Sequence, residues 1–239
     1  MQTVKPILQD GTFVGIEPTS VVLFSIPLAW WIASFFAIII GTAADVYVVG
    51  PGLDSDVKPI QLALDSDGLV VLDAQALNLL ATNSSLKQQI GMRDALTILL
   101  PHGGEFSRLM VGYVLESTGV PFEDVRLLAA QSGAVVYRKG SIGMIATPTG
   151  ELFFTRRTSE HLATAGSGDV LAGLLGSWLA ARRPHNFRAA ALVTAAAVVA
   201  HSLAAELVAD AGEPLSADEL EEALPIAVAE LGELGRAAD

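Results

Sequence analysis

The chain has 239 residues, with 26 acidic and 14 basic side chains, a net charge of −12 and no cysteine. Its length suits one large domain with a sizeable core, and the lack of cysteine excludes disulfides, thiolate zinc sites and cysteine nucleophiles. The acidic balance argues against a nucleic-acid partner, and the four histidines (His102, His161, His185 and His201) lack close metal-ligand spacing, so a structural transition metal is not expected.

The N-terminal part contains a long uncharged stretch, PTSVVLFSIPLAWWIASFFAIIIGTAA, at residues 18–44. About 20 apolar residues suffice to span a bilayer, so this stretch could anchor the chain, or it could be a buried helix or strand pair beside the core. Pro27 disfavours a single straight helix, and Lys5 as the only preceding cation makes a poor secretory signal. We favour burial, and we therefore expect a cytoplasmic protein with an atypical apolar segment at 1–44 and one domain at 45–239.

From residue 45 onward, short apolar β-branched runs alternate with helical patterns. We expect strands in 46–53, at the start of 68–81, at the start of 97–110 and in 133–140, a helix over 111–119, and a hairpin over 143–155 around Thr149 and Gly150. This alternation predicts an α/β fold, a mainly parallel sheet flanked by helices on both faces. Ligands bind at the carboxyl ends of the strands of such sheets, which here read GPGL, LDAQALN, PHGGE and RKGS.

Two long alanine-rich helices and a final helix are predicted to complete the chain. Ser216 and Glu219 form a capping-box pattern at the start of the final helix. The last residues, from 222 onward, are expected to fray.

The stretch ATAGSGDVLAGLLGSWLAARRP, residues 163–184, predicts a helix with Gly166 to Asp169 at its N-terminus. Free backbone N–H groups and the helix dipole make such a terminus an anion site. Glycine at 166 and 168 lets an anion approach the backbone without a Cβ in the way. The stretch is neither a P-loop nor a Rossmann fingerprint, because residue 171 is leucine.

Asp169 places a carboxylate beside this anion site. It fits a general base that takes a proton from a hydroxyl attacking a phosphoryl group. It also fits an acid that only complements the helix dipole, and spacing alone leaves both interpretations open.

Several motifs together carry a family resemblance over about residues 45–230. GSGDVLAG resembles the GxGD signature of the ribokinase-like fold, and VVGPGL, VVLDAQALNLL, LPHGGEFSRL, VVYRKGSIGMIATPTG and LATAGSGDVLAGLLGSWLA follow the order of the ADP-dependent NAD(P)H-hydrate dehydratases. Several motifs in register are far more specific than any one of them. Residues 1–44 do not resemble the glycine-rich segment that usually precedes the GPGL strand in that family.

The resemblance implies a repair enzyme that removes water from the hydrated nicotinamide ring of NADH or NADPH. A nucleotide, ADP or ATP with Mg²⁺, would phosphorylate the ring hydroxyl so that phosphate departs in its place. Asp169 falls on the family's catalytic position, with the backbone of Gly166, Ser167 and Gly168 as the anion hole. Gly52, His102 and Asp169 are implied to contact the substrate.

The resemblance also implies a nucleotide-binding site and an assembly. The nucleotide would be bound by Lys139, Gly140, Ser141, Ile142, Gly143 and Gly168, and the protein would form a homo-oligomer. Two other hypotheses remain: a ribokinase-like small-molecule kinase with the same base and anion hole, and an inactive nucleotide-binding remnant, tethered to a membrane or not.

Overall fold

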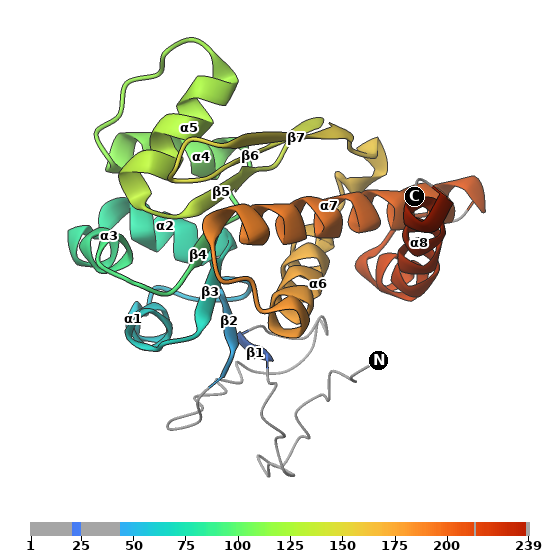
Figure 1. The fold of residues 1–239 in the computed structure, drawn as a ribbon, viewed down its shortest axis with the longest axis horizontal. Helices are drawn as coiled ribbons and strands as arrows, with labels where there is room; N and C mark the ends of the chain where they lie inside the picture. The colour runs from blue at the N-terminus through green and yellow to red at the C-terminus, as the bar shows by residue number, and fades with distance from the viewer. Residues whose placement is uncertain (1–20, 25–43, 213, 238–239) are drawn as a thin grey trace.

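Seven strands pair in chain order to form one sheet in the computed structural model, which describes residues 21–24, 44–212 and 214–237 (Figure 1). The strands are β1 (Val21–Phe24), β2 (Val46–Val49), β3 (Leu69–Leu72), β4 (Thr97–Leu99), β5 (Val135–Arg138), β6 (Ile142–Ala146) and β7 (Leu152–Arg157). Strands β1 to β5 are parallel, whereas β6 and β7 add antiparallel to the end of the sheet. The expected mainly parallel sheet is confirmed, and so is the hairpin, whose turn is closed by the Gly150 N–H donating to the Thr147 carbonyl at 3.0 Å.

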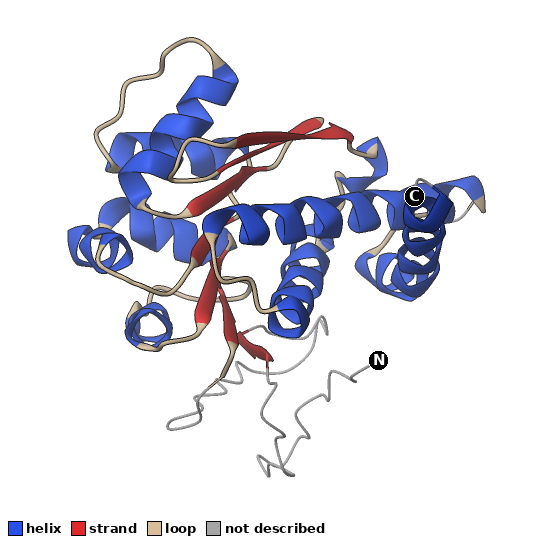
Figure 2. Cartoon of the chain, in the orientation of Figure 1, coloured by secondary structure: helices blue, strands red, loops and turns tan. Residues whose placement is uncertain are grey.

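Helices cover both faces of this sheet (Figure 2). One face packs against the helices of the first half of the chain: α1 (Lys58–Asp65), α2 (Ala74–Thr82), α3 (Ser84–Gly91), α4 (Gly103–Gly112) and α5 (Pro121–Ser132). The other face packs against α6 (Ser167–Arg182) and α7 (Phe187–Asp210), while α8 (Ala217–Ala237) packs on α7. A short 3₁₀ helix, η1 (Glu160–Leu162), precedes α6.

The strand sequences are apolar throughout because both faces of the sheet are buried. In β3, Val70 and Leu72 join the core beneath α1–α5, and Val71 between them joins the core beneath α6 and α7. All three side chains are fully buried. This is the pattern of a parallel strand between two helical layers, and it leaves the strand ends as the place for polar residues.

The helix expected at 111–119 is wrong, because α4 ends at Gly112. A Cβ on Gly112 would lie 2.2 Å from the Ala81 carbonyl oxygen, so the chain is packed closely against α2 there. Val114 follows with φ +57°, a left-handed conformation that interrupts a helix. The Asp124 carboxylate then accepts hydrogen bonds from Ser117 and Thr118, which fixes the loop ahead of α5.

The chain end is helical further than expected, since α8 continues through Ala237 with Pro225 inside it. Leu220, Ala223 and Ala227 pack with α7 residues in a small apolar cluster, and this packing holds the helix beyond residue 222. The predicted capping box is confirmed: Ser216 N–H donates to the Glu219 carboxylate at 3.1 Å, and Glu219 N–H donates to Ser216 Oγ at 3.4 Å.

Strand β1 lies within the uncharged stretch 18–44 and pairs in parallel with β2, Val21 opposite Val46 and Phe24 opposite Val49. Residues 18–20 and 25–43 of that stretch, with Trp30 and Trp31, lie outside the described residues. Among the described helices, α7 has the length and hydropathy of a membrane span, but 56% of its apolar window is buried inside the protein, as in a core helix.

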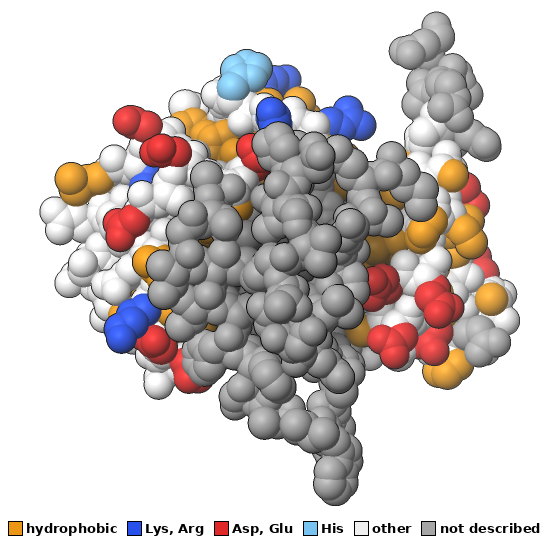
Figure 3. All heavy atoms as spheres, turned by 90° about the horizontal axis from the view of Figure 1, so that it is seen from below, with side chains coloured by type: hydrophobic (Ala, Val, Ile, Leu, Met, Phe, Trp, Pro, Cys, Tyr) orange, Lys and Arg blue, Asp and Glu red, His pale blue; other side chains and the backbone are white. Residues whose placement is uncertain are grey.

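Charged side chains on the face seen in Figure 3 are mostly scattered, with acidic groups gathered on the side of α8. The acidic residues of α8 whose side chains the structure describes are Asp218, Glu219, Glu221, Glu222 and Glu230. An acidic surface of this kind repels the phosphates of nucleic acid.

Candidate active site at the carboxyl ends of the strands

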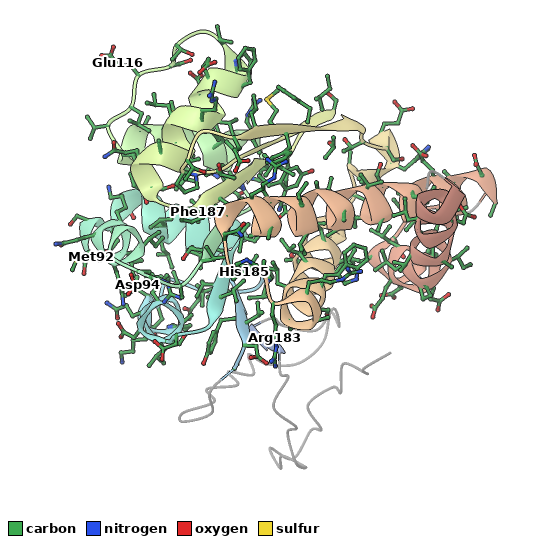
Figure 4. The ribbon with its side chains drawn as sticks, in the orientation of Figure 1. Met92, Asp94, Glu116, Arg183, His185 and Phe187 are labelled. Carbon is green, nitrogen blue, oxygen red and sulfur yellow. The ribbon has the colours of Figure 1, made fainter. Side chains whose placement is uncertain are left out.

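The direction of α6 places its first turn at the carboxyl ends of the parallel strands. Arg183, just after α6, pairs with Asp45, just ahead of β2, at 3.3 Å, so the end of the helix lies beside the amino ends of the strands (Figure 4). The first turn therefore lies at the opposite edge. Residues that follow β2, β3, β4 and β5 reach the same edge.

A buried ion pair joins the ends of β3 and β5. Both carboxylate oxygens of Asp73, which is 2% exposed, lie 2.7 Å from Lys139 Nζ. Asp73 Oδ1 also accepts from Ala74 N–H at 2.7 Å, and Ala74 has the uncommon φ of +46°. Lys139 N–H donates to the Pro101 carbonyl at 2.8 Å, so the lysine is fixed at both its backbone and its ammonium group. Sequence reasoning assigned no role to Asp73, although its place directly after a buried strand marked it.

The glycine turn after β2 packs directly on Asp73. A Cβ on Gly50, which has φ +136°, would lie 1.8 Å from the Asp73 carbonyl oxygen, so only glycine fits there. Leu53 N–H closes the turn by donating to the Gly50 carbonyl at 3.0 Å. Gly52, with φ +67°, is exposed within this turn, so the structure brings this predicted substrate residue to the same edge.

The first turn of α6 lies beside the Lys139 ammonium and contains free amides. Gly166 begins the helix with φ +84°, and its carbonyl accepts from the N–H groups of Asp169 and Val170. Among the described residues, no acceptor pairs with the N–H groups of Ser167 and Gly168. A Cβ on Gly168 would lie 3.3 Å from Lys139 Nζ and 3.9 Å from Asp73 Oδ2. Unpaired amides beside a cation are what an anion site needs, and anion binding here stays a prediction.

Asp169 lies in the same turn, exposed at the rim of the site. Partial burial by the surrounding protein raises the pKa of its carboxyl above the ordinary 3.8, and the negative charge of Asp73 adds to this rise while Lys139 opposes it. A carboxylate whose proton affinity is increased is a better general base than an ordinary surface aspartate. The role of Asp169 as the base stays a prediction.

His102 begins α4 at the end of β4, as its N-terminal cap. The ring Nδ1 of His102 accepts from Gly104 N–H at 3.0 Å. The backbone N–H of His102 donates to the Glu105 carboxylate at 2.9 Å, which completes a capping box. Burial raises the pKa of Glu105, the His102 N–H bond lowers it, and the charge of Asp73 raises it. The His102 side chain remains 57% exposed, so contact with a substrate stays a prediction. Glu105 was not singled out from the sequence, although it completes the PHGGE motif.

The predicted nucleotide loop divides into an accessible part and a buried part. Thr158 fixes the accessible part: its hydroxyl donates to the Gly140 carbonyl at 2.7 Å and its N–H to the Ser141 carbonyl at 2.9 Å. Ile142 is 51% exposed at the start of β6. Gly143 is buried, however, and its N–H donates to Thr155 Oγ1 at 3.0 Å.

The backbone of Gly143 is therefore not exposed beside Lys139 and Gly168. A Cβ there would lie 2.5 Å from Thr155 Oγ1, so its glycine identity is explained by packing. The binding roles of Lys139, Gly140, Ser141 and Ile142 stay predictions.

Two hollows of the surface lie away from this site. One, of about 510 Å³, lies at the amino ends of β2 and β3 between Asp45, Asp67 and Arg183. The other, of about 340 Å³, lies between α4 and α5 beside Phe106 and Arg138. Neither is lined by Asp169 or Lys139, so neither is the anion site.

The model of the family described as NAD(P)H-hydrate dehydratase matches residues 31–226 of the chain. The chain belongs to the NAD(P)H-hydrate dehydratase family. The match includes every strand-end motif of the site just described, and it confirms the family resemblance found in the sequence.

Similar proteins of named activity include bacterial repair enzymes. A bifunctional NAD(P)H-hydrate repair enzyme of Mycobacterium tuberculosis is 40% identical over 60% of this chain and 30% of its own length. An ADP-dependent (S)-NAD(P)H-hydrate dehydratase of Neisseria meningitidis is 37% identical over 57% of this chain and 47% of its own. The alignment therefore spans less than half the length of these relatives.

Solved structures of this family share the fold. The ADP/ATP-dependent NAD(P)H-hydrate dehydratase of Bacillus subtilis, co-crystallized with ATP/Mg²⁺ and soaked with CoA, superposes with a TM-score of 0.66 at 30% identity. The match covers 79% of this chain and 67% of that one. A ribokinase-like superfamily protein of Enterococcus faecalis superposes with a TM-score of 0.58 at 23% identity, which supports the ribokinase-like fold.

Proposed function

We propose that the protein catalyses the ADP-dependent dehydration of hydrated NADH and NADPH. One observation carries the proposal: Asp169, with its raised pKa, shares the first turn of α6 with the unpaired amides of Ser167 and Gly168, beside the Asp73–Lys139 pair. Family membership supplies the substrate class. A base and an anion hole within one turn, with a fixed cation beside them, are the groups that phosphoryl transfer to a hydroxyl requires.

In the proposed reaction Asp169 accepts the proton of the ring hydroxyl, and the hydroxyl oxygen attacks the terminal phosphorus of ADP. The bond from that phosphorus to the bridging oxygen breaks, and AMP leaves. The amides of Ser167 and Gly168 and the Lys139 ammonium stabilise the negative charge on the transferred group.

Elimination then completes the dehydration. The C–O bond breaks with its electrons going to phosphate, the ring nitrogen supplies electrons to the carbon, and the neighbouring ring carbon releases a proton to solvent. The products are the reduced nicotinamide ring, AMP, phosphate and a proton, so the hydroxyl oxygen of the hydrate ends in the phosphate.

Mg²⁺ would enter this site with the nucleotide. The described residues contain no group of three or more His, Asp or Glu side chains that could hold a metal ion. Mg²⁺ is commonly held by phosphates, waters and one or two carboxylates, and the exposed Asp169 is a carboxylate at the phosphate site that could contribute. When bound, the ion would neutralise phosphate charge, and no step above depends on its position.

We also propose that the protein acts in the cytoplasm as a homo-oligomer. Apolar side chains support an assembly surface on β6, β7 and the start of α5: Ile142, Phe154 and Phe122 are exposed, and the rings of Phe122 and Phe154 meet edge to face at 6.2 Å. Light scattering on the purified chain measures the mass, and a monomer at all concentrations would contradict this part of the proposal.

The test is the return of reduced-nicotinamide absorbance when the protein is added to hydrated NADPH with ADP and Mg²⁺. Absorbance should return in step with AMP and phosphate release. A stable phosphate ester without the absorbance would instead identify a small-molecule kinase. Nucleotide binding without either product would identify an inactive remnant.

A further inference from the structure

A buried histidine on α7 contacts the backbone of the anion site from behind. His201 is 4% exposed, and its Nε2 lies 2.8 Å from the Ser167 carbonyl oxygen. A carbonyl oxygen can only accept, so Nε2 carries the proton and donates. Burial is the main reason that the pKa of His201 falls to about 4, so the ring is neutral at neutral pH and this single tautomer persists.

The geometry points to a positioning role: we infer that His201 fixes the Ser167–Gly168 peptide so that the Gly168 N–H faces the phosphate of the bound nucleotide. A peptide unit is planar and trans, so its C=O and N–H groups point in opposite directions. When the Ser167 carbonyl points to α7, the Gly168 N–H of the same unit must point away from α7. On that side, a Cβ on Gly168 would lie 3.3 Å from Lys139 Nζ.

The Ser167 side chain does not hold the Ser167–Gly168 peptide. Its hydroxyl is directed to the preceding turn, at 2.8 Å from the Leu162 carbonyl and 3.0 Å from the Thr164 carbonyl. Ser167 is the first residue of α6, in the end turn that the helix holds least firmly, and its carbonyl accepts from the N–H group four residues on. The hydrogen bond from His201 adds a second donor to this carbonyl, from α7.

The next residue on α7 anchors the other end of the same connection. Ser202 Oγ accepts from Ser159 N–H at 2.8 Å, and Thr158 beside it holds the carbonyls of Gly140 and Ser141. Two consecutive α7 residues therefore hold both ends of the segment between β7 and α6. Helix α7 therefore holds both the nucleotide loop and the anion hole in place.

Two substitutions of His201 separate positioning from mere packing. His201→Gln keeps a donor near the Nε2 position, whereas His201→Leu keeps volume and removes the donor. Thr194→Val is the matched control, because Thr194 is a buried α7 residue whose hydroxyl bonds the Ala190 carbonyl of its own helix. Thermal unfolding of all three variants reports their folding.

This inference rests on the proposed function for its kinetic readout. In the dehydration assay, His201→Leu should lower kcat about 10²-fold, comparable to the loss of one oxyanion-hole donor, while KM for the hydrated nucleotide changes little. His201→Gln should recover most of kcat, and Thr194→Val should leave kcat unchanged even if its thermal midpoint falls. Equal losses of kcat in His201→Leu and His201→Gln would overturn the inference.

A second readout is independent of turnover. The amide resonance of Gly168 in a ¹⁵N-labelled sample should shift on titration with ADP and Mg²⁺ in the wild type and in His201→Gln, and should not shift in His201→Leu. Absence of a wild-type shift, or an equal shift in His201→Leu, would overturn the inference. A wild-type protein that shows the shift but does not convert hydrated NADPH would overturn the proposed function alone.

Discussion

Asp169 is influenced by two opposing charges in addition to its partial burial. Asp73 raises its pKa and Lys139 lowers it, and partial burial contributes more than either. Because Asp73 and Lys139 are held together with both contacts at 2.7 Å, their effects on Asp169 largely offset each other. The pair therefore supplies a fixed cation for phosphate without removing the basicity of Asp169.

Replacing Asp169 by asparagine tests the general base. Asp169→Asn should lower kcat about 10²- to 10⁴-fold and leave ADP affinity nearly unchanged, because the amide keeps the shape but accepts no proton. An acid with a raised folded pKa loses folding stability as pH rises through that pKa, so the variant should be at least as stable as the wild type at pH 7. Calorimetry measures ADP affinity, kinetics measures kcat, and thermal unfolding measures stability. Asp94→Asn is the control, because Asp94 is exposed (Figure 4). Near-normal kcat would remove Asp169 from the mechanism.

Replacing Asp73 by asparagine tests the charge balance through pH. The loss of its negative charge lowers the pKa of Asp169, and the freed Lys139 charge acts in the same direction. The acidic limb of the kcat/KM profile should therefore move to lower pH in Asp73→Asn than in the wild type. The variant should also lose about 3 kcal/mol of stability, the low end for a broken buried pair, since Lys139 stays 21% exposed. Asp210→Asn is the control. An acidic limb that stays at the same pH or moves to higher pH in Asp73→Asn would contradict this account.

A side chain at Gly168 tests the anion site. Gly168→Val places methyl groups between the amides of the first turn and the Lys139 ammonium, where phosphate must approach. Hydrogen bonds to charged groups contribute about 1.5–3 kcal/mol, so ADP affinity measured by calorimetry should fall about 10- to 100-fold. Gly173→Val on the same helix is the control, because a Cβ there has no atom within 4 Å. Unchanged affinity in Gly168→Val would place the anion site elsewhere.

At the scale of elements, the strand ends could be predicted and the contacts between them could not. Apolar runs followed by GPGL, LDAQALN, PHGGE and RKGS fixed the strands and their polar ends, because a buried strand permits little else. The pairing of Asp73 with Lys139 joins residues 66 apart in the chain, and no local pattern reports such a contact. The contact of His201 with Ser167 depends on the packing of α7 over α6, which periodicity does not specify. The burial of Gly143 could not be predicted for the same reason, since its neighbour Thr155 comes from another strand.

The turn after β2 and the end of β3 form one unit that depends on Gly50. Gly50→Ala should cost about 2–4 kcal/mol, from left-handed strain together with overpacking against the Asp73 carbonyl. Activity should fall with it, because the carbonyl that must move belongs to the residue that holds Lys139. Urea unfolding measures the loss, and Gly119→Ala is the control, since Gly119 has φ +79° with open space and should cost only about 1–2 kcal/mol. Equal losses in the two variants would show that the contact with Asp73 is unimportant.

For the whole molecule, the sequence predicted the class of fold and the family, and it left the N-terminal stretch ambiguous. Residues 18–44 have a composition that fits a buried segment as well as an anchor. The pairing of β1 with β2 decides in favour of the sheet for residues 21–24, because a strand bonded within the sheet cannot also be part of a membrane-spanning helix.

The last prediction concerns the dependence of the fold on that N-terminal strand. Val46, Val48 and Val49 of β2 are at most 1% exposed, and β1 supplies hydrogen-bonding partners along one side of β2. A variant that begins at Asp45 would expose this apolar strand as a sheet edge, which favours association with other chains. We therefore expect the full chain to be recovered in the detergent-free supernatant after fractionation, and the shortened variant to aggregate or to unfold at lower urea concentration. The opposite pattern, with the full chain confined to the membrane pellet and the shortened variant folded in the supernatant, would show that the N-terminal segment is an anchor and that the sheet is stable without β1.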